Sequence, residues 1–358
     1  MADGGAAGSG LVAQTMEVPD DTAKFYELSL QMRWGDGLPV VPPTDVRVKE
    51  MLATTPYAFD DVICVLPPRD GVATAEAVAI NAVLAGCEPE AFPLVVAALE
   101  AISAPEFNAV ALTTTTSSVF PMLIVNGPSR DRLGIDYRAG CLGGAAGRGS
   151  MTIGRAMSLC LRNIGGQRAG ETSRTVFGQP ARTGLCFGEW EERSPWPSLA
   201  ARAGFTDEDE VVSVHGGKGT FTMADINNDD PRDLAYLIAK CIAYPLSNHY
   251  LERTGANGEI VLAINPMWAE RFGREFPRIE SFQEFLLEHA WQPLDLWPEK
   301  NQKILRAKDR IDEHGHVPVV RTPQQFVPVV CGGLGNLHAV ALPSFVQSQI
   351  QSVAAVRV

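Results

Sequence analysis

The chain has 358 residues, of which 46% are hydrophobic, with a formal net charge of -12 at pH 7 and a pI near 5.0. A chain of this length is too long to fold around one ordinary small core, which predicts two domains or one large two-lobed domain. The acidic balance and the scattered Lys and Arg residues exclude nucleic acid and an anionic membrane surface as main partners, because both require a basic face.

The sequence carries no signal for a membrane or for disulfide bonds. No apolar run approaches the roughly 20 residues that a bilayer requires, and residues 1–20 lack the basic and apolar regions of a signal peptide. The seven cysteines are an odd number, spread along the chain without a CxxC pair, which excludes a zinc ribbon and a disulfide framework. We therefore expect a cytoplasmic protein whose cysteines are mostly small buried apolar residues.

The first half of the chain predicts alternating helices and strands. Residues 1–20, rich in Gly, Ala and Ser, predict a disordered tail, and residues 21–180 a first α/β lobe. Asp20 or Asp21 is expected to cap the first helix, and Thr44 a second one. The further expected elements are strands at 62–66, 108–112 and 122–125, and helices at 74–85, 90–101 and 152–163.

The second half repeats this alternation, and residues 181–358 are predicted to form a second α/β lobe. The boundary is placed in the polar, irregular residues 168–182. The fold class is thus α/β, with two related lobes of mixed sheets flanked by helices. The expected elements are strands at 210–214, 260–264 and 326–330, helices at 231–242, 281–289 and 298–308, and glycine loops at 215–219 and 332–335.

Two segments echo each other and suggest an internal duplication. The apolar residues 123–125 and 262–264 each precede an Asn, Asn126 or Asn265, with a Pro shortly after it and a Gly eight residues further on. Each reads as a strand, a capping Asn, a short helix and a terminating Gly, at Gly134 and Gly273. The alternative is a coincidence of common strand-turn-helix patterns. Two related halves would place a ligand in the crevice between them.

The most glycine-dense stretch, residues 140–150, runs into the helix expected from Thr152. Backbone N–H groups at such a helix start can hold an anion, and Arg148 can add a bidentate contact. A flexible connection is the alternative, and the loop at 215–219 is a weaker version of the same pattern. The candidate substrate-binding residues are Gly144, Arg148, Ser150, Thr152 and Asn126.

An acidic and aromatic segment supplies the candidate catalytic residues Cys186, Glu189, Glu191 and Glu192. Carboxylates crowded against aromatic rings have raised pKa values and can transfer protons near neutrality. In a strand, Glu189 and Glu191 would face one way and Glu192 the other. The alternative is a solvated acidic turn ahead of a helix at Ser194.

Histidines and metals enter as alternatives. His338, after the last glycine loop, is the histidine favoured for a catalytic role, whereas His314 and His316 are expected in a solvated loop. A metal-dependent site would use ligands among Glu189, Glu191, His215 and His338. No cofactor is required by the sequence, and no nucleotide motif is present.

Five segments together resemble a known family. They are RWGDGLPVVPPT at 33–44, NAVLAGC at 81–87, IVNGP at 124–128, TIGRA at 152–156 and the residues Cys186, Phe187, Glu189, Glu191, Glu192, Ser194, Pro195 and Trp196. The combination resembles a bacterial family of uncharacterised proteins often fused to, or encoded beside, a selenoprotein-type domain with a Sec/Cys-Gly-Ser-Cys motif. That domain is itself similar to the selenocysteine subunits of amino-acid reductases, which break carbon–heteroatom bonds.

The chain departs from the family pattern in three places. The family has Asn where Cys141 or Ser150 stands here. In the family the last His comes two residues after the third Gly, whereas here His338 comes three residues after Gly335. The Cys-Gly-Ser-Cys domain is absent from this chain. The resemblance therefore implies that thiol or selenol chemistry needs a separate partner chain or one of this chain's own cysteines.

These observations lead to one main hypothesis and two alternatives. The main one is a small-molecule enzyme that cleaves or rearranges a carbon–heteroatom bond in a small anion, with a glutamate and a cysteine or His338 moving protons. Lyase, hydrolase and reductive chemistry stay open. The alternatives are a metal-dependent hydrolase or lyase, and a non-catalytic subunit that binds a thiol or selenol protein. A homo-oligomer is compatible with each.

Overall fold

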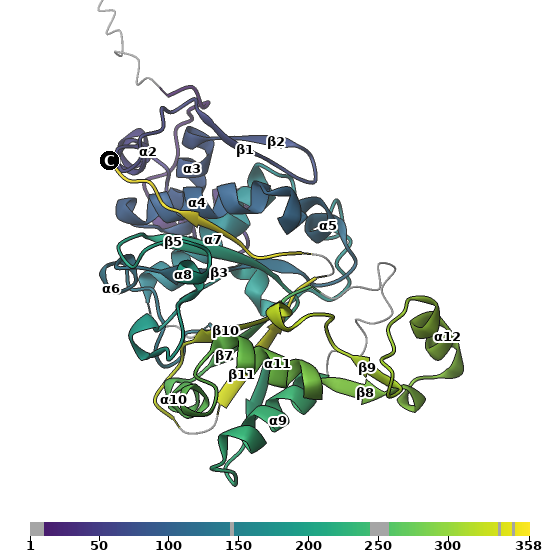
Figure 1. Ribbon diagram of the computed structural model, residues 1–358. Helices are drawn as coiled ribbons and strands as arrows, with labels where there is room; N and C mark the ends of the chain where they lie inside the picture. Colours follow the sequence, from purple (N-terminus) through teal and green to yellow (C-terminus); the bar gives the residue numbers. More distant parts are fainter. Residues whose placement is uncertain (1–10, 144–146, 244–257, 336–337, 346–347) are drawn as a thin grey trace, which may run out of the picture.

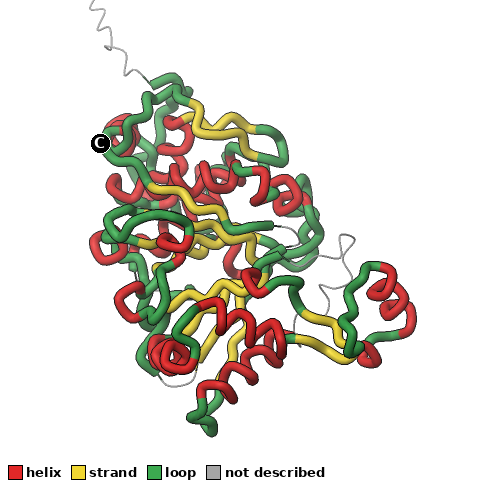
Figure 2. Tube along the Cα trace, viewed as in Figure 1, coloured by secondary structure: helices red, strands yellow, loops and turns green. Residues whose placement is uncertain are grey.

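The computed structural model describes residues 11–143, 147–243, 258–335, 338–345 and 348–358. Two four-stranded mixed sheets pack face to face, and helices cover the outer face of each sheet (Figure 1 and Figure 2). The predicted α/β class with mixed, helix-flanked sheets is confirmed.

The first sheet has the strand order β12-β5-β3-β4. Its central strand β3 runs parallel to β4 and antiparallel to β5, which in turn pairs antiparallel with β12. Side chains of β3 alternate, because Leu123 and Val125 face the helices while Met122 and Ile124 face the second sheet. The strands are β3 (Phe120–Asn126), β4 (Leu185–Gly188), β5 (Val211–Gly217) and β12 (Gln351–Ala354).

Helices of the first half cover this sheet in two tiers. Helix α4 packs on β5 and β12, α7 packs on β4 and β3, and α3 lies on α7. A small hairpin and several shorter helices complete the periphery. The elements are α1 (Thr22–Gln31), α2 (Asp45–Leu52), β1 (Val62–Leu66), β2 (Gly71–Thr74), α3 (Ala75–Ala85), α4 (Phe92–Ser103), α5 (Ala109–Thr114), α6 (Ser129–Arg132), α7 (Arg148–Asn163) and α8 (Leu199–Arg202).

The second sheet has the order β10-β7-β11-β6. Its central strand β7 runs parallel to β10 and antiparallel to β11, which pairs antiparallel with β6. Side chains of β7 alternate as those of β3 do, with Leu262 and Ile264 toward the helices and Val261 and Ala263 toward the first sheet. The strands are β6 (Phe221–Ala224), β7 (Ile260–Ile264), β10 (Phe326–Val330) and β11 (His338–Pro343).

Three helices cover the outer face of the second sheet, and an arm extends from them (Figure 1). Aromatic side chains dominate this layer, with Trp268, Phe272 and Phe282 fully buried. The elements are α9 (Pro231–Ala243), α10 (Pro266–Glu275) and α11 (Ile279–His289) in the layer, and β8 (Trp291–Pro293), α12 (Glu299–Ala307) and β9 (His316–Pro318) in the arm.

The two sheets have the same pairing pattern and exchange their fourth strand. β6 follows β5 in the chain but pairs in the second sheet, and β12 follows β11 but pairs in the first. Where the two connections cross, Lys218 N donates to Pro343 O at 2.8 Å and Phe345 N to Gly216 O at 2.8 Å. A division at residue 180 therefore cuts through the first sheet, because β4 and β5 follow it. A common origin of the halves stays a prediction.

Two local expectations are wrong. Residues 109–114 form helix α5 rather than part of a strand, after Asn108 adopts a left-handed φ of 60°. Residues 215–217 belong to strand β5 rather than to a loop, and His215 is buried there. Glycine is used at Gly217 for close packing, since a Cβ there would lie 2.2 Å from Met122 Sδ.

The echoed segments also differ in their helices. Asn265 caps α10, with its side chain accepting from Trp268 N, whereas α6 has only four residues and Asn126 does not cap it. Gly134, at φ 61°, follows α6 as expected. Gly273 lies inside α10 instead of ending it. Glycine is needed there because a Cβ would lie 2.2 Å from Pro195 Cβ.

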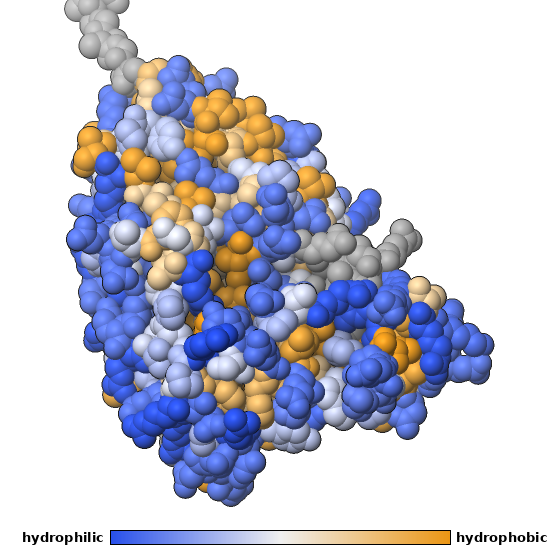
Figure 3. Space-filling view, viewed as in Figure 1, coloured by the Kyte–Doolittle hydropathy of each residue, from blue (hydrophilic) through white to orange (hydrophobic). Residues whose placement is uncertain are grey.

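The N-terminal segment and the surface add three observations. Residues 1–10 lie outside the described residues, while Val12 N and Ala13 N donate to the buried Glu76 carboxylate. Apolar side chains gather over the β1–β2 hairpin, where Val62, Val65 and Val72 are exposed (Figure 3). Among the described residues, no single helix has the length and apolarity to cross a membrane, although the bent pair Pro89–Ser103 and Pro105–Thr114 passes the same test jointly.

Candidate functional site

The two central parallel strand pairs end at equivalent positions, and the candidate site lies there. Val125 pairs with Gly188, so Asn126 stands beside Glu189 at the end of the first sheet. Ile264 pairs with Val330, so Asn265 stands beside Cys331 at the end of the second. Ligands in α/β proteins commonly bind beyond the carboxyl ends of parallel strands.

The first strand end is closed by Glu189, which is 1% exposed. Its Oε2 accepts from Asn126 Nδ2 at 2.8 Å and from Leu199 N, at the start of α8, at 2.7 Å. Burial raises the pKa of Glu189, while the neighbouring Arg202 and the two hydrogen bonds act in the opposite direction. The carboxylate joins β3, β4 and α8, and this role is structural.

Glu191 and Glu192 are held by Arg130, which follows β3 on α6. Arg130 Nη2 lies 2.7 Å from Glu192 Oε1, its Nε lies 3.2 Å from Glu191 Oε1, and its Nη1 donates to the Glu189 carbonyl. Glu191 also accepts from Gly127 N at 2.8 Å. Residues Glu191–Arg193 form one 3-10 turn, so the strand-like separation of faces expected for these glutamates does not occur.

Cys186 lies on β4 with its thiol fully enclosed between the first sheet and its helices. Burial raises the pKa of this thiol far above its ordinary value, with smaller contributions from Cys87 and Asp136. A thiol in this environment is a poor source of thiolate. The structure therefore supports a packing role for Cys186 rather than the nucleophilic role expected from the sequence.

The second strand end brings two other thiols together. Cys331 directly follows β10, and Cys141 lies in the loop between α6 and α7, so the pair joins both halves of the chain. The hydrogen bond from Cys331 lowers the pKa of Cys141, and the same bond raises the pKa of Cys331. Trp190 N, next to Glu189, donates to Val330 O at 2.6 Å, so the two strand ends lie side by side.

A cavity of about 160 Å³ opens beside these thiols. The glycine loop after Cys331 forms one wall, and Gly332 N donates to Tyr137 O at 2.9 Å. Asn265, the N-cap of α10, donates to Gly335 O at 2.7 Å. The lining residues are Cys141, Leu142, Ala263, Asn265, Cys331, Gly332, Gly333, Gly335 and Val340.

His338 reaches this strand end by register alone. Ala339 pairs with Ile264, so His338 is the residue of β11 that stands beside Asn265 along the sheet. The backbone of His338 is described, but its side chain lies outside the described residues. Its expected proton-transfer role stays a prediction.

The expected anion-binding residues serve other partners. α7 begins at Arg148, four residues before the expected start at Thr152. Arg148 Nη1 pairs with Glu88 at 2.6 Å and its Nε donates to Gly86 O, while Thr152 Oγ1 donates to Arg148 O. Ser150 Oγ accepts from Asp136 N at 2.7 Å.

The two remaining residues expected to bind substrate are Gly144 and Asn126. Gly144 lies outside the described residues. Asn126 is used by Glu189, and its Oδ1 is buried without a partner in the part of the chain that the structure describes.

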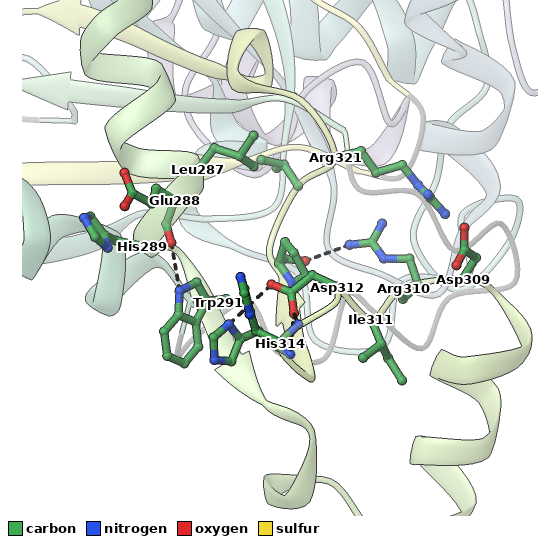
Figure 4. Close-up of a pocket in the computed structure, with 13 residues that line it drawn as sticks. Leu287, Glu288, His289, Trp291, Asp309, Arg310, Ile311, Asp312, His314 and Arg321 are labelled. Atoms are coloured by element: carbon green, nitrogen blue, oxygen red, sulfur yellow. Dashed lines mark hydrogen bonds and ion pairs between the residues drawn. The ribbon is translucent and has the colours of Figure 1, made fainter.

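A histidine-rich cavity of about 610 Å³ lies between α11 and the arm (Figure 4). The His316 ring stacks on Trp291 with centroids 3.5 Å apart, and its Nδ1 lies 3.3 Å from Asp312 Oδ2. Asp312 also accepts from the backbone of His314 and His316. The residues that the structure describes contain no group of three or more His, Cys, Asp or Glu placed to hold a metal.

Sequence reasoning missed Cys141, Cys331 and Arg130. Both cysteines adjoin glycines, in Gly140-Cys141 and Cys331-Gly332-Gly333, and Cys331 follows a predicted strand directly. Those positions were the available signal, because a residue between a strand end and a glycine loop lines ligand sites in α/β folds. No protein-family model matches the chain, and neither does any curated protein.

Proposed function

We propose that this chain is an enzyme that reductively cleaves a carbon–heteroatom bond in a small anionic molecule, with Cys141 and Cys331 as its dithiol. The observation that carries the proposal is that Cys141 and Cys331, one from each half, pack in the same buried cluster and line the same 160 Å³ cavity. The cavity is smaller than the roughly 300–1,000 Å³ typical of drug-sized ligands, so the substrate is small.

The reaction has two steps. The Cys141 thiolate attacks the carbon, a C–S bond forms, and the heteroatom leaves with the proton that the Cys141 thiol released on ionising. The Cys331 sulfur then attacks the Cys141 sulfur, an S–S bond forms, and the C–S electron pair stays on the carbon, which takes the proton of the Cys331 thiol. The dithiol loses two electrons and the substrate gains them, so one heteroatom is replaced by hydrogen.

Local electrostatics support Cys141 as the attacking thiol. The hydrogen bond from Cys331 lowers the pKa of Cys141, which increases its thiolate fraction at neutral pH. The N-terminus of α10, capped by Asn265, lies at the same cavity and favours negative charge. Glycines at 332, 333 and 335 leave the backbone open to close approach by a ligand. A substrate carboxylate fits this end of the cavity.

Each turnover leaves a Cys141–Cys331 disulfide that must be reduced. A dithiol, or the thiol and selenol of a partner protein, attacks one sulfur and leaves carrying the new disulfide. This requirement agrees with the partner domain that the family resemblance implies. A small dithiol such as dithiothreitol replaces that partner in an assay.

Alkylation by iodoacetate and iodoacetamide tests the first step, because both carry a carbon–iodine bond and only one is an anion. In the native protein we expect Cys141 to react at least about tenfold faster with iodoacetate than with iodoacetamide. Half-buried Cys241 on α9 is the internal control and should not prefer the anion. Peptide mass spectrometry measures both sites. Modification of Cys241 alone would contradict the proposal.

Oxidation tests the second step. Treatment of the reduced protein with diamide should form the Cys141–Cys331 disulfide as the main product, and dithiothreitol should reverse it. The Cys331→Ser variant should lose this product while keeping the reaction of Cys141 with iodoacetate. A wild-type protein whose diamide product lacks this crosslink would overturn the dithiol mechanism.

A further inference from the structure

A second cavity, of about 680 Å³, lies in the first half between α1, α3 and the C-terminal end of α7. Residues 11–18 form its outer wall, and the backbone N–H groups of Val12 and Ala13 donate to Glu76 within it. This cavity is separate from the thiol site, because the loop with Cys141 precedes α7 and the cavity lies at the other end of that helix. The 16 residues of α7 span roughly 24 Å.

Most of the cavity wall is apolar. Phe25 and Trp34, whose ring centroids are 6.4 Å apart, stand on one side, and Ile80 and Leu84 of α3 on another. Val48 of α2 completes this part of the wall. An apolar surface of this size fits the hydrocarbon or aromatic body of a ligand.

One end of the cavity carries polar groups with unused bonding capacity. Asn163 Nδ2 donates to Asn81 Oδ1 at 2.8 Å and to Trp34 O at 2.7 Å, but Asn163 Oδ1 is buried without a partner among the described residues. Arg168 Nη1 is likewise buried without a partner in the described chain. Unpaired buried polar atoms cost stability, and a ligand that pairs them recovers that cost.

Arginine side chains gather at the polar end. Burial and then the neighbouring guanidinium groups of Arg162, Arg33 and Arg69 lower the pKa of Arg168. Arg162 Nε is also buried and has no partner in the described parts of the chain. Glu171 offsets part of this charge through its ion pair with Arg33. Arg33 and Arg168 line the cavity together with the carboxylates of Asp45 and Glu76. Glu76 is occupied by the backbone of Val12 and Ala13, so the unpaired Nη1 of Arg168 favours an anion at this end.

We infer that this cavity binds an amphiphilic organic acid. The carboxylate of the ligand pairs with Arg168, its apolar body contacts Trp34 and Phe25, and a donor group on it bonds Asn163 Oδ1. Residues 11–18, held by Glu76, cover the bound ligand. The cavity thus supplies a second ligand site, independent of the thiol pair.

Naphthaleneacetate and its uncharged isostere naphthaleneacetamide test this inference by isothermal titration calorimetry on the full chain. The wild type should bind the acid about tenfold or more tightly than the amide, because the charge-assisted bond to Arg168 forms only with the acid. Equal affinity for the two probes, or no binding of either, would overturn the inference.

Three variants separate the head-group contact from the apolar contact. Arg168→Gln should remove the preference for the acid, whereas Trp34→Ala should weaken the binding of both probes to the same extent. Arg274→Gln, on the exposed face of α10, is the matched control and should bind as the wild type does. Retained acid preference in Arg168→Gln would contradict the proposed head-group site.

Two additional variants keep the test decisive. If Arg168→Gln does not fold, Arg33→Gln replaces it, because Arg33 lines the same cavity and is exposed. It should reduce the acid preference about threefold. Cys141→Ser should bind both probes as the wild type does, so failure of the thiol mechanism leaves this result unchanged.

Discussion

The ends of the two central strand pairs differ in side chains while their backbones correspond. At the first end, Asn126 stands beside Glu189, whose buried carboxylate accepts two hydrogen bonds and ties three elements together. At the second, Asn265 stands beside Cys331, which contacts Cys141 at the wall of a cavity. One end is a structural joint, and the other is a candidate reaction site.

The difference arises from what each side chain does with the space beyond the strand. Glu189 reaches Leu199 N and so draws α8 against the first sheet. Cys331 has a short side chain, and the glycines that follow it leave volume unfilled. A similar strand pairing therefore supports either packing or chemistry, and one residue beyond the strand decides which.

Replacement of Glu189 by Ala should produce the largest effect on stability. The change leaves two buried N–H donors unpaired and Arg202 without its buried counter-charge, so we expect the free energy of unfolding to fall by about 3 kcal/mol or more. Cys331→Ala, at the equivalent position, should cost only about 1 kcal/mol. Urea unfolding measures both, and equal losses would contradict the contrast between the two ends.

Lowering the pH should reduce the stability of the region where the two halves cross, and the group responsible is His215. His215 Nε2 lies 2.8 Å from Leu342 O, and burial lowers the pKa of this histidine from 6.5 to about 4. Between those values the unfolded chain binds a proton that the folded chain does not, so stability falls as pH drops through this window. The loss is up to about 3 kcal/mol.

The variant His215→Gln isolates this effect. Glu259 works in the opposite direction, because burial raises its pKa to about 6 and protonation then favours the folded state. The difference between wild type and His215→Gln, measured by urea unfolding at several pH values, removes that contribution. A difference that does not change with pH between 6.5 and 4 would rule out His215 as the cause.

Replacement of Arg130 by Gln should loosen the first strand end. Arg130 is 6% exposed and holds both Glu191 and Glu192, so its loss should lower the free energy of unfolding by about 2 kcal/mol. Arg138→Gln is the matched control, because Arg138 contacts the same Tyr137 ring with an exposed side chain. Its effect should stay within about 0.5 kcal/mol in thermal or urea unfolding.

The smallest effect is expected at Asn265. Asn265→Ala removes the cap of α10 and should cost about 1 kcal/mol, while Asn265→Ser retains the cap and most of the stability. The Ala variant should also slow the reaction of Cys141 with iodoacetate severalfold, because Asn265 orders the glycine loop through Gly335. An unchanged alkylation rate would separate the cap from the reaction site.

Much of the fold follows from local patterns. The strands at 62–66, 260–264 and 326–330 occur as expected, and Asp21 caps α1, because apolar runs between turn signals and capping side chains act over a few residues. The short run at 108–112 is wrong, since apolar runs of that length suit either a helix or a strand.

The candidate site is less accessible from the sequence. Carboxylates at 189, 191 and 192 were expected to act on a substrate, but their bonds to Asn126, Gly127 and Arg130 come from more than 50 residues away in the chain. Cys141 and Cys331 are separated by most of the second half, so their contact has no local signature. Gly217 and Gly273 lie where the chain packs closely rather than where it reverses direction. This close packing depends on Met122 and Pro195, respectively.

The sequence by itself determined the α/β class, the caps formed by Asp21 and Asn265, and the positions of strands β7 and β10. These features depend on apolar periodicity and on side chains within one helical turn. The tertiary structure alone decided the exchange of β6 and β12, the partners of each glutamate and the pairing of the two thiols. Such contacts depend on which strands meet, and that is set by packing between residues far apart in the chain.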